Sequence, residues 1–302
     1  MMIETHPPIP VDVSTAISSI INGGGKRLRP ALVLLSSYMC GADLEKAVPV
    51  AAAVEMLHTA TLIHDDLIDD ATMRRGVQTL NASWTAVATV LAGDMAFAWA
   101  AKLATRGQDL RLMARFSETL ETICGGELTQ MFNGRRTIPT VESYYERIFA
   151  KTASLFALTT EAGPLLAGYP HAETRRLRHF GGLLGEAFQI VDDVLDFMST
   201  EEMLGKPVGG DLRQGLITLP VLYYLEQHPG DPRIQTVLDR TEDEAVVQSL
   251  VADLRRSDAA DRAMVKAEAH ITEALSILDP YPDTAYRRAM REIAEFAVHR
   301  RY

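Results

Sequence analysis

The feature that most constrains the fold is a helical spacing of apolar residues, which recurs along most of the chain. In one stretch Val54, Leu57, Thr61, His64 and Ile68 follow one another at intervals of three and four, the period of one helix face. Patterns of this kind occupy residues 44–68, 82–104, 110–131, 141–160, 172–198, 216–228, 243–254, 257–278 and 284–300. The sequence therefore predicts an all-α fold, a single bundle of helices joined by short loops.

Glycine and proline support the same fold class, because they gather in a few places. They cluster at 23–25, 205–210 and 229–232 instead of recurring every ten residues or so, as a β-sandwich would require. No fixed-period repeat and no low-complexity linker interrupts the chain. We therefore expect one domain over residues 1–302, with residues 1–14 as a loose N-terminal arm.

Charge and cysteine content narrow the function classes. The chain has 30 Lys and Arg against 40 Asp and Glu, a net charge of −10, which argues against non-specific nucleic-acid binding. Its two cysteines, Cys40 and Cys124, are too few for a disulfide framework and lack metal-type spacing. A reducing compartment follows, so we expect a cytoplasmic protein.

No targeting or membrane segment is expected. The N-terminal residues have no basic segment followed by an apolar stretch, so they are not typical of a secretory signal. The most apolar window, residues 85–101, is interrupted by Asp94 and is shorter than the roughly 20 residues of a bilayer span. We interpret it as a buried helix.

Two acidic segments carry the first sign of chemistry. Each contains the pattern D-D-x-x-D within apolar sequence, and on a helix its three carboxylates form a compact patch of oxygens. Carboxylates about 4 Å apart repel by roughly 4 kcal/mol at an effective dielectric constant near 20, so acids packed into apolar helices need cations. Oxygen ligands favour Mg²⁺, which we expect as several ions, or a hard relative such as Mn²⁺. The six acids are Asp65, Asp66 and Asp69, then Asp192, Asp193 and Asp196.

For one such segment alone, a solvated helix face is an equally good interpretation. Basic residues near both segments add to the case for an anionic ligand. A glycine-rich run at 23–25 precedes three cations, and it lacks the order of a nucleotide-binding P-loop. An ordinary turn with solvated cations, and a structural histidine at position 58, are the alternatives. The candidates are Lys26, Arg29, His58, Arg74, Arg75 and Lys206, with Asp211 as one more acid in the loop after Lys206.

These residues stand in motifs that resemble the trans-isoprenyl diphosphate synthases, also called polyprenyl synthetases. The motifs are GGKRLRP at 24–30, EMLHTATLIHDDLID at 55–69, RRG at 74–76, KTASLF at 151–156, GEAFQIVDDVLD at 185–196, GKPVGGDL at 205–212 and TLP at 218–220. The resemblance implies a bundle of mostly antiparallel helices around a deep central cavity, and a homodimer. It also implies a medium- or long-chain enzyme.

The resemblance assigns a role to each matching residue. The six aspartates would hold Mg²⁺ ions that bind the diphosphate of an allylic substrate, and Arg74, Lys151, Gln189 and Lys206 would contact the same diphosphate or its metals. Lys26, Arg29, His58 and Arg75 would bind isopentenyl diphosphate, and Thr152 would lie beside the reacting carbons. The implied reaction is ionisation of the allylic substrate, head-to-tail condensation and proton elimination.

One position departs from the family pattern. Where many relatives read D-L-x-x-G-K-x-T-L-P, this chain has Leu216 in place of the lysine, between Asp211 and Thr218. A cation near the diphosphate is therefore missing. Some long-chain relatives share this loss, so we interpret it as a mark of subfamily.

Product length is expected to depend on the depth of the cavity below the first acidic segment. In short-chain relatives an aromatic residue four or five positions before the first aspartate closes the floor, and here those positions hold Thr61 and Ala60. Both are small, so we expect a product longer than fifteen carbons, with the long-chain range preferred. Growth would stop at deeper bulk, for which the candidates are Met95, Phe97, Trp99 and Met131.

Two other function classes remain. A class I terpene cyclase also ionises an allylic diphosphate, but it carries one D-D-x-x-D with an Asn/Ser/Glu second site. A noncatalytic subunit of a heteromeric prenyl synthase is the other alternative, and an accessory subunit stays open even for an active chain. Small-molecule diphosphates, rather than nucleic acid, are the expected ligands in every case.

Overall fold

The computed structural model describes residues 11–74, 76–133, 137–200, 208–239 and 243–299. The all-α prediction is confirmed, because in these ranges every element except one hairpin is helical. The hairpin pairs the two-residue strands β1 (Met73–Arg74) and β2 (Val77–Gln78) in antiparallel register. It follows directly on the helix that carries the first acidic segment.

The helices of the first half are α1 (Val11–Asn22), α2 (Leu28–Cys40), α3 (Leu44–Ile68), α4 (Ala86–Ala104), η1 (Thr105–Gly107), α5 (Leu110–Asn133), α6 (Val141–Ile148) and η2 (Phe149–Ala153). Those of the second half are α7 (Ser154–Leu166), α8 (His171–Met198), α10 (Gly210–Arg213), α11 (Leu219–Gln227), α12 (Pro232–Leu238), α13 (Glu244–Arg256), α14 (Ala259–Ile277) and α15 (Ala285–His299).

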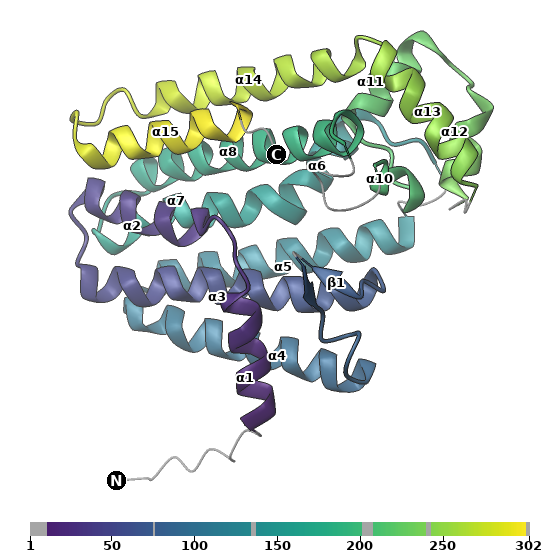
Figure 1. Cartoon of the computed structure of the whole chain (residues 1–302). Coiled ribbons are helices and arrows are strands. Elements are labelled where there is room, and N and C mark those ends of the chain that lie inside the picture. The colour runs from purple at the N-terminus through teal and green to yellow at the C-terminus, as the bar shows by residue number, and fades with distance from the viewer. Residues whose placement is uncertain (1–10, 75, 134–136, 201–207, 240–242, 300–302) are drawn as a thin grey trace.

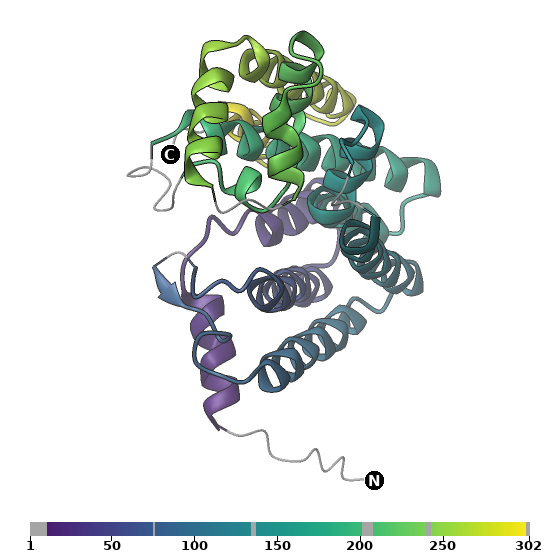
Figure 2. The ribbon, with the colours of Figure 1, turned by 90° about the vertical axis from the view of Figure 1, so that its right-hand side faces the viewer.

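The long helices stack in layers (Figure 1). Helix α3 packs against α4 on one side and α2 on the other, α2 packs against α7, α7 against α8, and α8 against α14. The view in Figure 2 looks at these layers from one end of the bundle, where the green helices, among them α12 and α13, lie in front of the upper part of the stack and the ends of α3, α4 and α5 are seen uncovered below them. Burial of the apolar faces of these helices contributes most of the favourable free energy of folding.

The N-terminal arm is shorter than predicted. Helix α1 begins at Val11, so residues 11–14 are helical, while residues 1–10 lie outside the described part of the chain. Ile17 of α1 is fully buried in a cluster that also contains Ile63 of α3. This burial holds α1 against the bundle, and the sequence did not predict this helix.

The helix predicted over 141–160 is interrupted. Residues 149–153 form η2, a π-helical segment between α6 and α7. A π-turn inserts one extra residue into the helix and changes the directions of its side chains, and such turns occur often at functional sites. Both Lys151 and Thr152 lie in this segment.

Helix α4 is buried on one face only, so the prediction of a buried helix is wrong for its other half. Ala92, Ala96 and Ala100 are buried, whereas Val87 and Leu91 are 71% and 62% exposed. Judged by length and composition only, the helical stretches Leu44–Ile68 and Ala86–Gly107 are both long and apolar enough to cross a membrane. The first of these, α3, lies inside the bundle between α2 and α4 (Figure 1).

Close packing of α2 on α7 yields a stability prediction. A Cβ added to Gly163 would lie 2.3 Å from the carbonyl carbon of Ser36, which is rigid helix backbone. We expect Gly163→Ala to lower the free energy of unfolding by about 1–3 kcal/mol through overpacking, measured by urea denaturation. Gly125 is the matched control, since a Cβ there meets no atom within 4 Å and Gly125→Ala should gain up to about 1 kcal/mol. Equal midpoints for the two variants would contradict this packing.

Candidate active site

The two acidic segments lie at the C-terminal ends of two long helices. Asp65 and Asp66 are in the last turn of α3 and Asp69 is its C-cap residue, while Asp192, Asp193 and Asp196 are in the last two turns of α8. Both helices end on the side of the bundle that Figure 2 turns toward the viewer. Asp66, Asp193 and Asp196 are buried, and Asp69 is exposed.

Lys151 links the two segments. Its Nζ lies 3.2 Å from Oε1 of Glu127 on α5. Burial acts to lower the pKa of Lys151, but the charges of Glu127, Asp65 and Asp69 outweigh it and raise the pKa above its ordinary value. On its other side Lys151 lines a cavity of about 90 Å³ together with Gln189 and Asp193. Lys151 is therefore near enough to Asp65 and Asp69 for their charges to act on it, and it shares a cavity with Asp193 of the second segment.

Two side chains hold Asp193 directly, and a third holds one of those two. The Tyr144 hydroxyl donates to its Oδ2 at 2.8 Å, and Nε2 of Gln189 donates to its Oδ1 at 2.8 Å. The hydroxyl of Thr152 donates in turn to Oε1 of Gln189 at 2.7 Å. Four residues from α6, η2 and α8 thus form one hydrogen-bonded chain that fixes the orientation of the carboxylate.

Asp196 organises the loop that follows α8. Its Oδ2 accepts a hydrogen bond from the backbone N–H of Asp211 at 3.0 Å, and its carbonyl accepts one from the N–H of Gly209 at 2.9 Å. Gly209 has φ +80°, the left-handed region that favours glycine, and Val251 of α13 leaves little space for a Cβ there. Arg255, also on α13, donates to the carbonyls of Phe197 and Ser199 at 2.7 and 2.6 Å and so caps the end of α8.

Asp66 is paired with Arg74 of the β1–β2 hairpin. Nε of Arg74 lies 2.6 Å from Oδ1 of Asp66. Burial raises the pKa of Asp66, although this hydrogen bond and the arginine charge oppose the shift. The hairpin therefore brings one of the predicted diphosphate contacts directly to the first acidic segment, while its neighbour Arg75 lies outside the described residues, as does Lys206.

Electrostatics at the site favour an added cation. Burial raises the pKa of Asp65 to about 6, despite the nearby charge of Lys151, and burial likewise raises the pKa of Asp193 to about 6, despite its hydrogen bonds. Ionising these carboxylates at neutral pH is costly unless positive charge is added. Their oxygens are the ligand type that Mg²⁺ prefers, so the donor set fits that metal.

The acids do not form a complete metal cage by themselves. Among the residues that the structure describes, no three His, Cys, Asp or Glu side chains are close enough to hold a metal ion. Mg²⁺ commonly keeps several waters and is bound by one or two carboxylates plus substrate phosphates. The arrangement therefore suits metal ions that arrive with a phosphorylated ligand.

The cations that follow the glycine-rich run contact three different helices. Arg27 has φ +50° and forms an ion pair with Glu55 of α3, three positions before the half-buried His58. Nζ of Lys26 lies 4.8 Å from the centre of the Phe296 ring, and the guanidinium carbon of Arg29 lies 4.6 Å from that of Phe156. The predicted second diphosphate site thus gathers around the start of α2 and the middle of α3.

The two positions predicted to set product length are not equivalent. Ala60 is fully buried in a cluster with Ala92 and Ala96 of α4. Thr61 is half-buried, and its hydroxyl donates to the carbonyl of His58 at 2.8 Å. Added volume at Ala60 therefore meets a packed helix interface, whereas Thr61 has partly accessible surface.

Sequence reasoning missed several residues that organise the site. Tyr144, Arg147 and Glu127 lie around Lys151 and Asp193, and Arg255 caps α8 from a distant helix. The sequence offered one local indication for Arg147 and Tyr144. They precede Lys151 by four and seven positions, the spacing of residues on one helix face. Nothing in the sequence links Glu127 or Arg255 to the acidic segments, because those contacts depend on how the helices pack.

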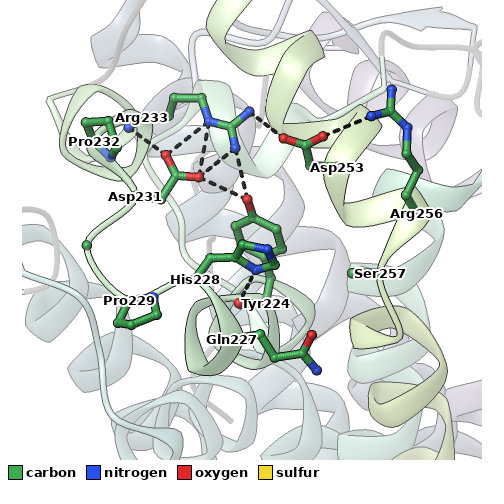
Figure 3. A pocket seen from close by; sticks show the side chains of 11 residues that line it. Tyr224, Gln227, His228, Pro229, Asp231, Pro232, Arg233, Asp253, Arg256 and Ser257 are labelled. Atoms are coloured by element: carbon green, nitrogen blue, oxygen red, sulfur yellow. Dashed lines mark hydrogen bonds and ion pairs between the residues drawn. The ribbon is translucent and has the colours of Figure 1, made fainter.

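A second pocket, of about 800 Å³, opens between α11, α12 and α13 (Figure 3). Its charged groups are paired with one another: the Arg233 guanidinium contacts Asp231 at 2.6 Å and Asp253 at 2.8 Å. The Tyr224 hydroxyl donates to Asp231 at 3.0 Å. This network fastens α12 and α13 to α11, and through α13 it supports Arg255.

Comparisons with known proteins agree with the geometry. The polyprenyl synthetase family profile matches residues 11–254. The chain is 38% identical to heptaprenyl diphosphate synthase component 2 of Geobacillus stearothermophilus, over 94% of this chain and 88% of that protein. It is 35% identical to octaprenyl diphosphate synthase of Escherichia coli, over 93% and 88% of the two chains. A crystal structure of polyprenyl synthase from Caulobacter crescentus, complexed with calcium and isoprenyl diphosphate, superimposes with a TM-score of 0.91 and 34% identity, over 98% and 91% of the two chains.

Proposed function

This chain belongs to the polyprenyl synthetase family and is a polyprenyl diphosphate synthase, and on that premise we propose how its residues carry out the reaction. The substrates are isopentenyl diphosphate and an allylic diphosphate. The allylic diphosphate would bind between the acidic ends of α3 and α8, and isopentenyl diphosphate would bind beside Lys26, Arg29, His58 and Arg75. The convergence of both acidic segments on Lys151 is the observation that carries this assignment.

Each group at the site has a task in the proposed mechanism. Mg²⁺ ions, held by the aspartates and the substrate together, would neutralise the charge that grows on the departing diphosphate. Lys151 and Arg74 would add fixed positive charge beside the same group. Gln189 and Tyr144 would keep the Asp193 carboxylate oriented, and Thr152 would lie next to the reacting carbons. The apolar interior would exclude water from the allylic cation until isopentenyl diphosphate attacks and a proton is lost.

The defining experiment incubates purified protein with labelled isopentenyl diphosphate and each allylic primer in turn, with Mg²⁺, Mn²⁺ or EDTA. We expect elongated polyprenyl diphosphates in the presence of either metal and none in EDTA. Hydrocarbon products would indicate a cyclase and overturn the proposal. A full set of products in EDTA would overturn the metal assignment alone.

A partner-dependent enzyme is the second candidate. The name of the Geobacillus relative describes it as component 2 of its synthase, which favours this candidate. Activity of the purified chain alone would exclude it. Its signature would be an inert chain that still binds inorganic pyrophosphate with Mg²⁺.

We also propose a homodimer, formed through the exposed apolar face of α4. Val87 and Leu91 are 71% and 62% exposed on that face, and Val90 beside them is 40% exposed. A patch of this kind on a folded chain is typical of an interface. We expect Leu91→Arg to produce monomers in sedimentation velocity experiments, because a buried, unpaired guanidinium is costly. Val265→Arg on α14, at a 61% exposed position, is the matched control and should leave the assembly unchanged.

A cytoplasmic location completes the proposal. Cys40 and Cys124 are both free thiols, which suits a reducing compartment. Fractionation of cells that express the untagged chain would test it, and recovery with membranes after a high-salt wash would contradict it.

A further inference from the structure

Arg147 lies on α6 and is not part of the family motifs found in the sequence. Arg147 lines the cavity of about 90 Å³ that also contains Lys151, Gln189, Asp193, Asp211 and Leu216. It stands one helical turn before Lys151, so the two cations enter the cavity from the same stretch of chain. The cavity thus has a second positive charge close to the second acidic segment.

The Arg147 guanidinium is fixed in place. Its Nη2 donates to the carbonyl of Ile217 at 2.8 Å, and its central carbon lies 5.5 Å from the centre of the Tyr144 ring. Tyr144 is the residue that donates to Asp193. A guanidinium has five N–H donors in a rigid plane, so one hydrogen bond to Ile217 leaves donors for an anion in the cavity.

Arg147 differs from the other cations of the site in its charge balance. Arg74 contacts Asp66 and Lys151 contacts Glu127, so each already has a carboxylate partner. Within the described ranges Arg147 forms no ion pair closer than 4.0 Å. No carboxylate in the described part of the chain lies within 4.0 Å of this half-buried guanidinium, although its charge acts on Asp193 in the same cavity, so its free donors are well suited to bind a ligand anion.

Leu216 explains why an additional cation is needed there. Many relatives carry lysine at this position, and here the leucine side chain lines the same cavity as Arg147. Ile217, whose carbonyl holds the guanidinium, is the next residue in the chain. The arginine therefore lies beside the backbone segment from which a lysine would otherwise reach into the cavity.

We propose that Arg147 binds the diphosphate of the allylic substrate and supplies the positive charge that Leu216 lacks. The inference rests on the proposed function and names one further contact of the same site. Arg147 would then belong to the diphosphate-binding site. The positive charge that many relatives obtain from a lysine at position 216 would come from Arg147 in this chain.

The test measures binding of inorganic pyrophosphate with Mg²⁺ by titration calorimetry, alongside the steady-state KM for the allylic primer. We expect Arg147→Gln to weaken pyrophosphate binding and raise that KM by about 10- to 100-fold, the range for losing a charge-assisted contact. Adding Leu216→Lys to this variant should recover most of the loss. Adding Leu216→Met, which has similar volume and no charge, should recover none of it.

These measurements separate a binding role from a merely structural one. If Arg147 only held the 216–218 segment, lysine and methionine at position 216 would behave alike, and that outcome would overturn the inference. Unchanged pyrophosphate affinity in Arg147→Gln would overturn it too. Arg147→Lys provides a second variant that retains the charge, and it should bind pyrophosphate more tightly than Arg147→Gln. Failure of the proposed function is distinguishable, because it would appear in the wild-type chain as hydrocarbon products, or as the absence of both prenyl transfer and pyrophosphate binding.

Discussion

Asp65→Asn is expected to lower kcat by about 100- to 1,000-fold, the range for losing one preorganised electrostatic contribution, because it removes a carboxylate that would hold the Mg²⁺ ions beside the departing diphosphate. The same substitution should weaken the stabilisation that Mg²⁺ and pyrophosphate together give to the folded chain. Asp70 provides a matched control on the same helix end, because it is exposed and has φ +51°, a conformation that asparagine tolerates. Asp70→Asn should retain wild-type kcat and wild-type stabilisation.

The pH dependence of stability provides a second readout of the same site. Burial raises the pKa of Asp65 from 3.8 in the unfolded chain to about 6. A group of this kind contributes stability below pH 3.8 that is lost as the pH rises through about 6, because folding opposes its ionisation. Without divalent cations the wild-type Tm should therefore fall between pH 4 and pH 7, and the fall should be smaller in Asp65→Asn.

Divalent cations should reverse this trend in the wild type. A metal ion favours the ionised carboxylate, so Mg²⁺ with pyrophosphate should raise the Tm more at pH 7 than at pH 5. Equal increases at both pH values, or an Asp65→Asn variant with a full metal response, would show that the first acidic segment does not bind the metal. Calorimetric scans of both variants, with and without EDTA, provide the comparison.

The contrast between local and non-local features explains what the sequence could predict. The helix at 44–68 was predicted with its observed bounds because its apolar spacing is a local signal, and the Asp43 side chain that caps its start in the structure is local as well. The π-helical turn at 149–153 was not, and the contacts that Lys151 and Thr152 make there, to Glu127 of α5 and Gln189 of α8, are non-local. Periodicity alone continued that stretch as one regular helix.

The same contrast applies to the site. The aspartates stand out in the sequence because two copies of one pattern are embedded in apolar helices. The partners that orient them do not: Arg255 reaches the end of α8 from α13, more than fifty residues away, and its role follows only from packing. Gly209 stands between these two cases. The glycines at 209 and 210 predict a turn, but the sequence does not show that Asp196 holds this turn through hydrogen bonds.

Thr61→Phe is expected to shorten the product substantially, if the chain grows past the α3 helix as the small side chains at positions 60 and 61 predict. Thr61 is half-buried, lies four residues before Asp65 and is not part of the buried cluster that Ala60 forms with α4, so a phenyl group there should not displace the α4 interface. Chromatography of products from one allylic primer would measure the shift from long chains toward chains of about twenty carbons or fewer.

Ala60→Phe is expected to behave differently, and comparing it with Thr61→Phe tests how α3 packs against α4. Ala60 is fully buried against Ala92 and Ala96, so phenylalanine there should first cost about 1–3 kcal/mol of stability by overpacking α3 against α4. We therefore expect a lower Tm for Ala60→Phe and a nearly unchanged Tm for Thr61→Phe. Unchanged product chromatograms for a folded Thr61→Phe variant would show that the growing chain takes another path, away from this face of α3.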